Sequence, residues 1–254
     1  MKMRSILVGM LVPMTQCFAS AVHAGKPAPK PIEVSATTAD STVLSADLYL
    51  PWDTGQARFP LVILMHMMNR DRRTYRDLVP LLLGRRWAVL NVDLRGHGKS
   101  NVVHGAKRKP EQLQESDFQQ MPADLGLLVT TASRRSARLD TLRVGVVGAS
   151  IGSSVAVFYG AEHPHTEGIV LLSPGLNYRN MELRPKFMQY SRRPVLILVG
   201  KQDQGSFESC MLLDNVAQGD KKLVVYPGAE HGTDIFRAVN GADTLVANWL
   251  GGRL

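Results

Sequence analysis

Residues 144–157, with the sequence VGVVGASIGSSVAV, decide the fold. An apolar run leads into a G-x-S-x-G pattern formed by Gly148, Ser150 and Gly152, and a helix-compatible run follows. The pattern predicts a sharp turn from strand to helix, where side chains at either glycine would collide with the neighbouring elements. Such a turn strains the serine backbone and exposes its hydroxyl above the sheet. Small residues also occupy these turns for packing alone, but the flanking runs favour Ser150 as a nucleophile.

Apolar and amphipathic runs alternate along the rest of the chain, which is typical of an α/β fold. Short, continuous runs rich in Val, Leu and Ile indicate parallel strands that are covered on both faces. The first two strands have only a short turn between them, so we expect an antiparallel hairpin at the sheet edge. Strands are predicted at 32–38, 43–50, 61–66, 87–93, 143–148, 168–173, 194–200 and 222–226, and helices at 72–83, 122–134, 151–163, 206–217 and 233–250.

A base and an acid follow later strands of this predicted sheet. Open sheets of this kind bind ligands beyond the carboxyl ends of their strands. His231 comes directly after the last predicted strand, between small residues, and Asp203 follows the strand before it. The order Ser150, Asp203, His231 is the order that suits a nucleophile, its orienting acid and its base in this fold. The alternatives are a loop histidine and a surface acid; Glu208 and Asp214 fall in the next predicted helix, where we expect them to face solvent.

Beyond these residues, the chain resembles the α/β-hydrolase superfamily over nearly all of its length after the N-terminal segment. Residues 93–100, DLRGHGKS, match a D-x-R-G-H-G-x-S segment that is common there after the fourth strand. In that superfamily the segment is a structural turn, so the resemblance implies that Asp93 and His97 support the site without acting as catalysts. His66 is expected to form a hydrogen bond within its own loop.

Residues 64–69, LMHMMN, match the oxyanion segment of the superfamily, which is usually written H-G-x. The resemblance implies an oxyanion hole made by the backbone N–H groups of Ile151 and Met68. Met67 stands where glycine is usual, so the donor from this loop is left open between Met67 and Met68. Met67 and Asn69 are expected to line the substrate pocket.

The segment 174–193 lies where many relatives insert a lid domain, and it has room for one short helix. We therefore predict an α/β-hydrolase fold with a mostly parallel eight-stranded sheet, helices on both faces and no substantial cap domain. The layout resembles the dienelactone-hydrolase-like and serine-aminopeptidase-like branches. Dienelactone hydrolases use a cysteine where Ser150 stands, so that activity is not expected.

An open site favours small soluble esters over lipids that need interfacial opening of a lid. We predict a serine hydrolase that cleaves such carboxylic esters through an acyl-enzyme intermediate. A serine peptidase or amidase on the same fold is the first alternative, and it requires an acidic pocket that the sequence does not locate. A binding protein that retains the fold is the second. We expect no metal site and no cofactor, because the histidines fall on separate loops and no glycine-rich phosphate loop is present.

The length of 254 residues and a hydrophobic content of 44% suit one domain with a sizeable core. Residues 1–24 have the layout of a bacterial signal peptide, with Lys2 and Arg4 before an apolar stretch and small residues before Gly25. We therefore expect export to the periplasm or the medium; the alternatives are an uncleaved anchor and a frayed terminus. Residues 25–31 are predicted to be a flexible lead-in and 32–254 the hydrolase domain. The apolar stretch is too short and polar for a stable membrane span.

The formal net charge is +8, and the basic residues are scattered along the chain. Aromatic residues make up 6%, and no basic region is interleaved with them, so we expect no nucleic-acid partner. Cys17 lies in the predicted signal peptide, which leaves Cys210 without a partner for an internal disulfide. The oligomeric state and the role of the long predicted loop 101–121 are left open by the sequence.

Overall fold

The computed structural model describes residues 26–52, 55, 58–190 and 192–254. The predicted signal peptide therefore lies outside the described residues, and export stays a prediction. Within the described ranges, no helix combines the length and apolar character that crossing a membrane requires.

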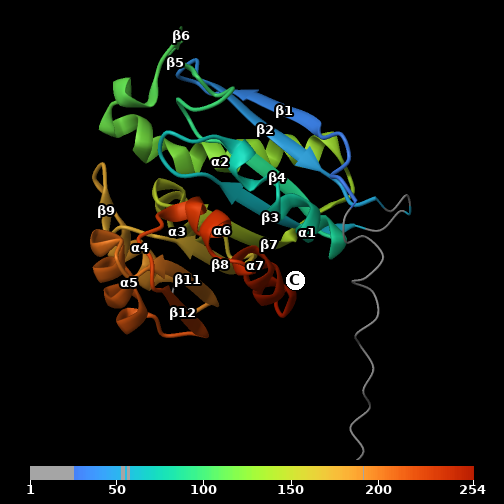
Figure 1. Ribbon diagram of the computed structural model, residues 1–254. Coiled ribbons are helices and arrows are strands. Elements are labelled where there is room, and N and C mark those ends of the chain that lie inside the picture. Colours follow the sequence, from blue (N-terminus) through green and yellow to red (C-terminus); the bar gives the residue numbers. More distant parts are fainter. Residues whose placement is uncertain (1–25, 53–54, 56–57, 191) are drawn as a thin grey trace, which may run out of the picture.

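The molecule is organised around a ten-stranded, mostly parallel sheet (Figure 1). Its order is β12-β11-β8-β7-β3-β4-β2-β5-β6, with β1 paired to β2. The strands from β12 to β4 are parallel, and the β1–β2 hairpin is antiparallel, as predicted. The bounds are β1 (Ile32–Thr37), β2 (Val43–Tyr49), β3 (Phe59–Met65), β4 (Ala88–Asp93), β5 (Val102–Val103), β6 (Ala106–Lys107), β7 (Leu139–Ala149), β8 (Thr166–Leu172), β11 (Val195–Gly200) and β12 (Lys221–Tyr226).

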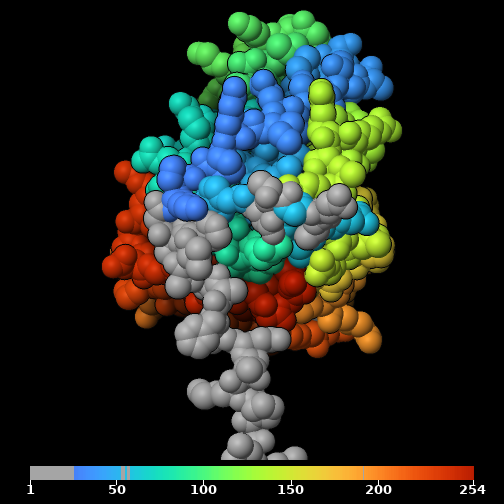
Figure 2. Space-filling model, turned by 90° about the vertical axis from the view of Figure 1, so that its right-hand side faces the viewer, coloured from blue at the N-terminus to red at the C-terminus, as the bar shows by residue number. Residues whose placement is uncertain are grey.

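All eight predicted strands are present, but in the described chain the sheet has ten strands, because the short β5 and β6 extend it beyond β2. The sequence did not predict these two strands or the two short strands of the hairpin in the segment 174–193. Two residues are too few to show the alternation that marks a strand. Figure 2 shows the blue N-terminal hairpin and the green segment around residue 110 toward one end of the molecule, and the red C-terminal residues toward the other.

Helices cover both faces of the sheet, as predicted (Figure 1). One apolar core lies under α2 to α5 and a second lies under α1, α6 and α7. Successive residues of a strand point into different cores: Val146 belongs to the first and Val147 to the second. The bounds are α1 (Leu78–Gly84), α2 (Glu115–Arg135), α3 (Ile151–Glu162), α4 (Leu183–Tyr190), α5 (Gln204–Val216), α6 (Ile235–Ala238) and α7 (Ala242–Gly251).

Three predicted helices differ from the structure: two are divided, and one begins earlier. The predicted helix 72–83 is a 3-10 turn, η1 (Arg72–Tyr75), followed by α1, and the predicted helix 233–250 is divided by Gly241, which has φ +80°. The predicted helix 122–134 begins earlier, at Glu115, so α2 occupies part of the expected loop 101–121. Its first turn is closed by Asp117, whose Oδ2 accepts a hydrogen bond from the Gln114 N–H at 2.9 Å.

The segment 174–193 contains α4 and a small hairpin of β9 (Asn177–Tyr178) and β10 (Met181–Glu182). This content agrees with the predicted lack of a substantial cap. In the described part of the chain, the carboxyl ends of the central strands are therefore not covered by an inserted domain.

The turn from β7 to α3 packs directly against the end of β3. A Cβ atom at Gly152 would lie 2.4 Å from the Met65 carbonyl oxygen, and one at Gly148 would lie 2.1 Å from the Gly152 carbonyl oxygen. Both distances are far inside van der Waals contact, so only glycine fits at either position. These collisions are the ones that the G-x-S-x-G pattern predicts.

We expect Gly152→Ala to destabilise the protein by roughly 1–3 kcal/mol or more, because the added methyl group forces β3 and α3 apart. Gly84→Ala is the matched control: its Cβ would meet nothing within 4 Å, and alanine is a better helix former than glycine. Urea unfolding of both variants measures the difference. Equal stability of the two variants would contradict the close packing described above.

Candidate active site

Ser150 lies between the end of β7 and the start of α3, with φ +52° and ψ −116°. A positive φ is rare for a residue with a side chain and costs on the order of 1–3 kcal/mol. The surrounding hydrogen bonds hold it there: the Ser150 N–H donates to the Leu172 carbonyl oxygen at 2.8 Å. The side chain is half-buried. The sequence thus predicted the backbone strain at this turn correctly.

The structure brings Asp203 and His231 into direct contact. His231 Nδ1 lies 2.7 Å from Asp203 Oδ2, and the Ser206 hydroxyl lies 3.4 Å from the same nitrogen. A carboxylate only accepts, so Nδ1 carries the proton in this contact. That tautomer leaves Nε2 with a free lone pair, which is the form that a general base needs. The His231 side chain is 41% exposed, so the ring has room to move.

The loop of His231 packs beside the serine. Gly232, with φ +58°, lies so close that a Cβ atom there would be 2.6 Å from Met67 Sδ and 3.5 Å from Ala149 Cβ. Ala149 directly precedes Ser150. The hydrogen bonds of the described residues do not include one between the Ser150 and His231 side chains. The structure therefore joins two of the three predicted catalytic residues and places the third beside their loop.

The oxyanion segment has a defined peptide orientation. The Met67 carbonyl oxygen accepts hydrogen bonds from His66 Nδ1 at 2.8 Å and from the Arg70 N–H at 3.2 Å. In a trans peptide the N–H points opposite to the C=O, so the Met68 N–H points away from the His66 ring. Among the described hydrogen bonds, none uses the Met68 N–H. Met67 is buried, Met68 is half-buried, and Asn69 is exposed with φ +59°.

His66 links the loops that follow β3 and β4. It is fully buried, donates from Nδ1 to the Met67 carbonyl, and accepts the Leu94 N–H at Nε2 at a distance of 3.0 Å. Burial lowers the pKa of His66 to about 4, and the nearby His97 ring contributes a smaller part of this shift. The ring is therefore neutral at physiological pH, and it holds the oxyanion segment in place, in agreement with the expected bond within its loop.

The DLRGHGKS segment is structural, as the resemblance implies. Asp93 accepts the N–H groups of Arg72 at 2.8 Å and Lys99 at 2.7 Å, and it forms an ion pair with Arg72. The buried His97 donates from Nδ1 to the Arg95 carbonyl at 2.9 Å. These contacts fold the turn after β4 back on itself and under the oxyanion segment.

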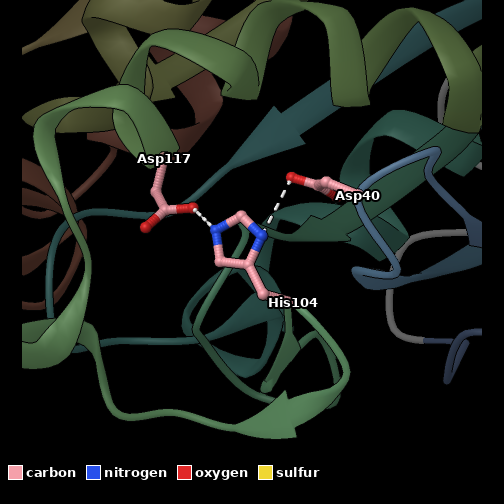
Figure 3. A group of neighbouring side chains, drawn as sticks. All are labelled: Asp40, His104 and Asp117. Carbon is pink, nitrogen blue, oxygen red and sulfur yellow. Dashed lines mark hydrogen bonds and ion pairs between the residues drawn. The ribbon is translucent and has the colours of Figure 1, made fainter.

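A cluster that the sequence did not predict lies on the β1–β2 side of this turn (Figure 3). His104 lies between two carboxylates, 2.9 Å from Asp117 and 3.5 Å from Asp40, and the three side chains have the residue types of a metal site. Arg95, however, is buried and pairs with both carboxylates and with Asp124. Because its guanidinium already supplies the positive charge there, we interpret the cluster as an ion-pair network. No spacing motif connects these residues, so the sequence carried no signal for it.

A strained serine on a strand–helix turn, with an Asp–His pair after later strands of a mostly parallel sheet, defines the chain as an α/β-hydrolase. The family described as serine aminopeptidase S33 matches residues 56–193, which is more than half of the chain. The chain therefore belongs to this family. The matched range contains Ser150 and the oxyanion segment and ends before Asp203 and His231.

Several solved structures share this fold. An esterase from Pyrococcus furiosus is 20% identical, with a TM-score of 0.68 over 88% of this chain and 93% of its own. A dienelactone hydrolase from Anabaena variabilis is 20% identical, with a TM-score of 0.66 over 89% and 97%. The Pyrococcus horikoshii acylaminoacyl peptidase is 11% identical, with a TM-score of 0.71 over 92% of this chain and 43% of its own. A search of curated proteins gives no match.

The low pKa of His66 predicts a pH dependence of stability. The unfolded histidine takes up its proton near pH 6.5 and the folded one only near pH 4, so stability falls as the pH drops through this window. The loss attributable to this group is roughly 3 kcal/mol. In His66→Gln, which cannot titrate, we expect lower stability at pH 7 but a flatter decline toward pH 4.5.

Urea unfolding at several pH values measures these slopes. The exposed His165, changed to glutamine, is the control, and we expect it to keep the wild-type slope. A His66→Gln variant with the wild-type slope would show that His66 is not the group responsible.

Proposed function

We propose that the protein is a serine hydrolase that cleaves small, soluble carboxylic esters through an acyl-enzyme on Ser150. The observation that carries this proposal is the 2.7 Å contact between His231 and Asp203, made by a loop that packs against the residue preceding the strained Ser150. A serine hydroxyl needs such a base to become nucleophilic.

In the proposed mechanism, His231 Nε2 accepts the Ser150 hydroxyl proton as the oxygen attacks the ester carbonyl. The Nδ1–H contact to Asp203 stabilises the imidazolium that forms. The imidazolium then protonates the leaving alcohol, and water, deprotonated by the same ring, releases the acid. For this step the half-exposed ring turns toward Ser150, since such hydrogen bonds are often loose without substrate.

The oxyanion is proposed to accept hydrogen bonds from the N–H groups of Ile151 and Met68. Ile151 opens α3, where the first N–H groups have no intrahelical partner. The Met68 N–H is supported by the orientation of the Met67 carbonyl, which is held on the opposite side by His66. One such donor lowers the barrier by about 3 kcal/mol.

The charges near the oxyanion segment favour esters over amino-terminal peptides, because the nearby carboxylates of Asp71 and Asp234 already pair with Arg73 and Arg70. An aminopeptidase binds the substrate α-amine with a carboxylate close to the scissile carbonyl. The acidic cluster of Asp40, Asp117 and Asp124 lies instead by β2, three strands from β7 in the sheet, or about 14 Å at normal strand spacing. Its charge is also partly balanced by Arg95. The family description still makes a peptidase or amidase the second candidate.

The surroundings of the oxyanion segment support a small and polar substrate. Two hollows of about 390 and 460 Å³ lie beside the end of this segment, where Asn69, Arg70 and Asp71 line both; Ser150 and His231 line neither. Their remaining lining is largely charged or polar, which suits soluble esters better than long alkyl chains.

We expect a fluorophosphonate probe to label Ser150 in the wild type, and Ser150→Ala or His231→Gln to reduce kcat for p-nitrophenyl acetate by roughly 10⁴-fold or more. Ser154→Ala is the matched control on the same helix, because its buried hydroxyl has no hydrogen-bond partner among the described residues. It should keep labelling and activity. Undiminished labelling of Ser150→Ala would overturn the proposed nucleophile.

A substrate series tests the proposed specificity. We expect kcat/KM to be highest for the acetate and butyrate esters of p-nitrophenol and to fall roughly tenfold or more by the octanoate, since little apolar surface is available for a long chain. Amino-acid p-nitroanilides should react more slowly than every short ester. Faster release from the anilides would favour the peptidase or amidase instead.

A further inference from the structure

Two consecutive residues at the end of β8 contact the proposed nucleophile and the loop that carries the proposed base. The Leu172 carbonyl oxygen accepts a hydrogen bond from the Ser150 N–H at 2.8 Å. The Ser173 hydroxyl accepts one from the Gly232 N–H at 2.9 Å, and Gly232 directly follows His231. A single short stretch of chain therefore connects the nucleophile to the loop that carries the base.

Ser173 is held firmly in an unusual conformation. It is 1% exposed, has φ +50°, and donates its own N–H to the Leu198 carbonyl oxygen at 2.8 Å. Glycine suits this left-handed region better than serine does. A serine is therefore disfavoured here by its backbone, and what it adds over glycine is the hydroxyl that contacts Gly232. Backbone strain of this kind is typical of functional sites.

The other side-chain contacts of the His231 loop are made by residues further along the chain from His231. Thr233 contacts the Thr74 hydroxyl at 2.8 Å, and Asp234 pairs with Arg70 at 3.3 Å. The Arg70 pair is largely exposed and is therefore weak. Asp203 contacts the ring itself, and the buried Ser173 contact fixes the backbone one residue away from His231.

We propose that Ser173 is a positioning residue, whose hydroxyl fixes the Gly232 backbone and thereby holds the His231 imidazole over Ser150. This inference rests on the proposed function. Without the hydroxyl, the Gly232 N–H loses its buried partner and the loop shifts to find another. A displacement of about 1 Å in a catalytic group is enough to slow a reaction by up to a hundredfold.

The test compares Ser173→Ala and Ser173→Gly with the wild type, using p-nitrophenyl acetate. We expect kcat to fall roughly ten- to hundredfold in both variants, while KM stays within about twofold, because the substrate pocket is unchanged. Ser173→Gly also relieves the backbone strain, so its melting temperature should equal or exceed that of Ser173→Ala. A loss of kcat without a matching loss of stability separates positioning from a merely structural role.

Thr166→Val is the matched control at the opposite end of the same strand. Thr166 is fully buried and its hydroxyl has no hydrogen-bond partner among the described residues, so we expect wild-type kcat. Wild-type kcat in both Ser173 variants, with an active wild type, would overturn this inference alone. A wild type that neither hydrolyses esters nor reacts with the fluorophosphonate probe would overturn the proposed function and this inference together.

Discussion

The close approach of α3 to the end of β3 is the constraint on which the rest of the structure depends. Gly152 lies against the Met65 carbonyl, and Gly148 lies against the Gly152 carbonyl, so no side chain fits at either position. The chain leaves β7 and enters α3 through Ser150, which has a positive φ of +52°. The same contact brings the loop after β3 next to the start of α3. One packing requirement thus places the serine and both candidate oxyanion donors together.

The loops at this edge of the sheet are held by buried polar contacts. His66 connects the loops after β3 and β4, and Asp93 closes the turn after β4 by accepting two backbone N–H groups. Arg95 joins that turn to the β1–β2 hairpin and to α2. Buried groups of this kind are costly if any partner is missing, so they specify one arrangement of the loops. The His231 loop has a weaker contact at its exposed end, where Asp234 pairs with Arg70.

The sequence predicted best those elements that have a long apolar or amphipathic pattern. The strands β3, β4, β7, β8, β11 and β12 contain continuous apolar runs, and each was predicted to within a few residues. The start of α2 was missed because Pro122 lies inside that helix and its first turn is polar, capped by Asp117. The two-residue strands β5 and β6 have no period to detect. The cluster of Asp40, His104 and Asp117 comes from three separate elements, and its members are unremarkable in the sequence.

The sequence by itself determined the layered α/β architecture, the strained turn at Ser150 and the order of the candidate acid and base. These follow from local patterns: apolar periodicity, glycines at fixed spacing, and polar residues directly after strands. The tertiary structure decided which side chains meet. It joined His231 to Asp203, turned the Met67 carbonyl toward His66, and placed Ser173 against Gly232. Such contacts depend on which strands, distant in the chain, lie side by side in the sheet. No local sequence pattern encodes that arrangement.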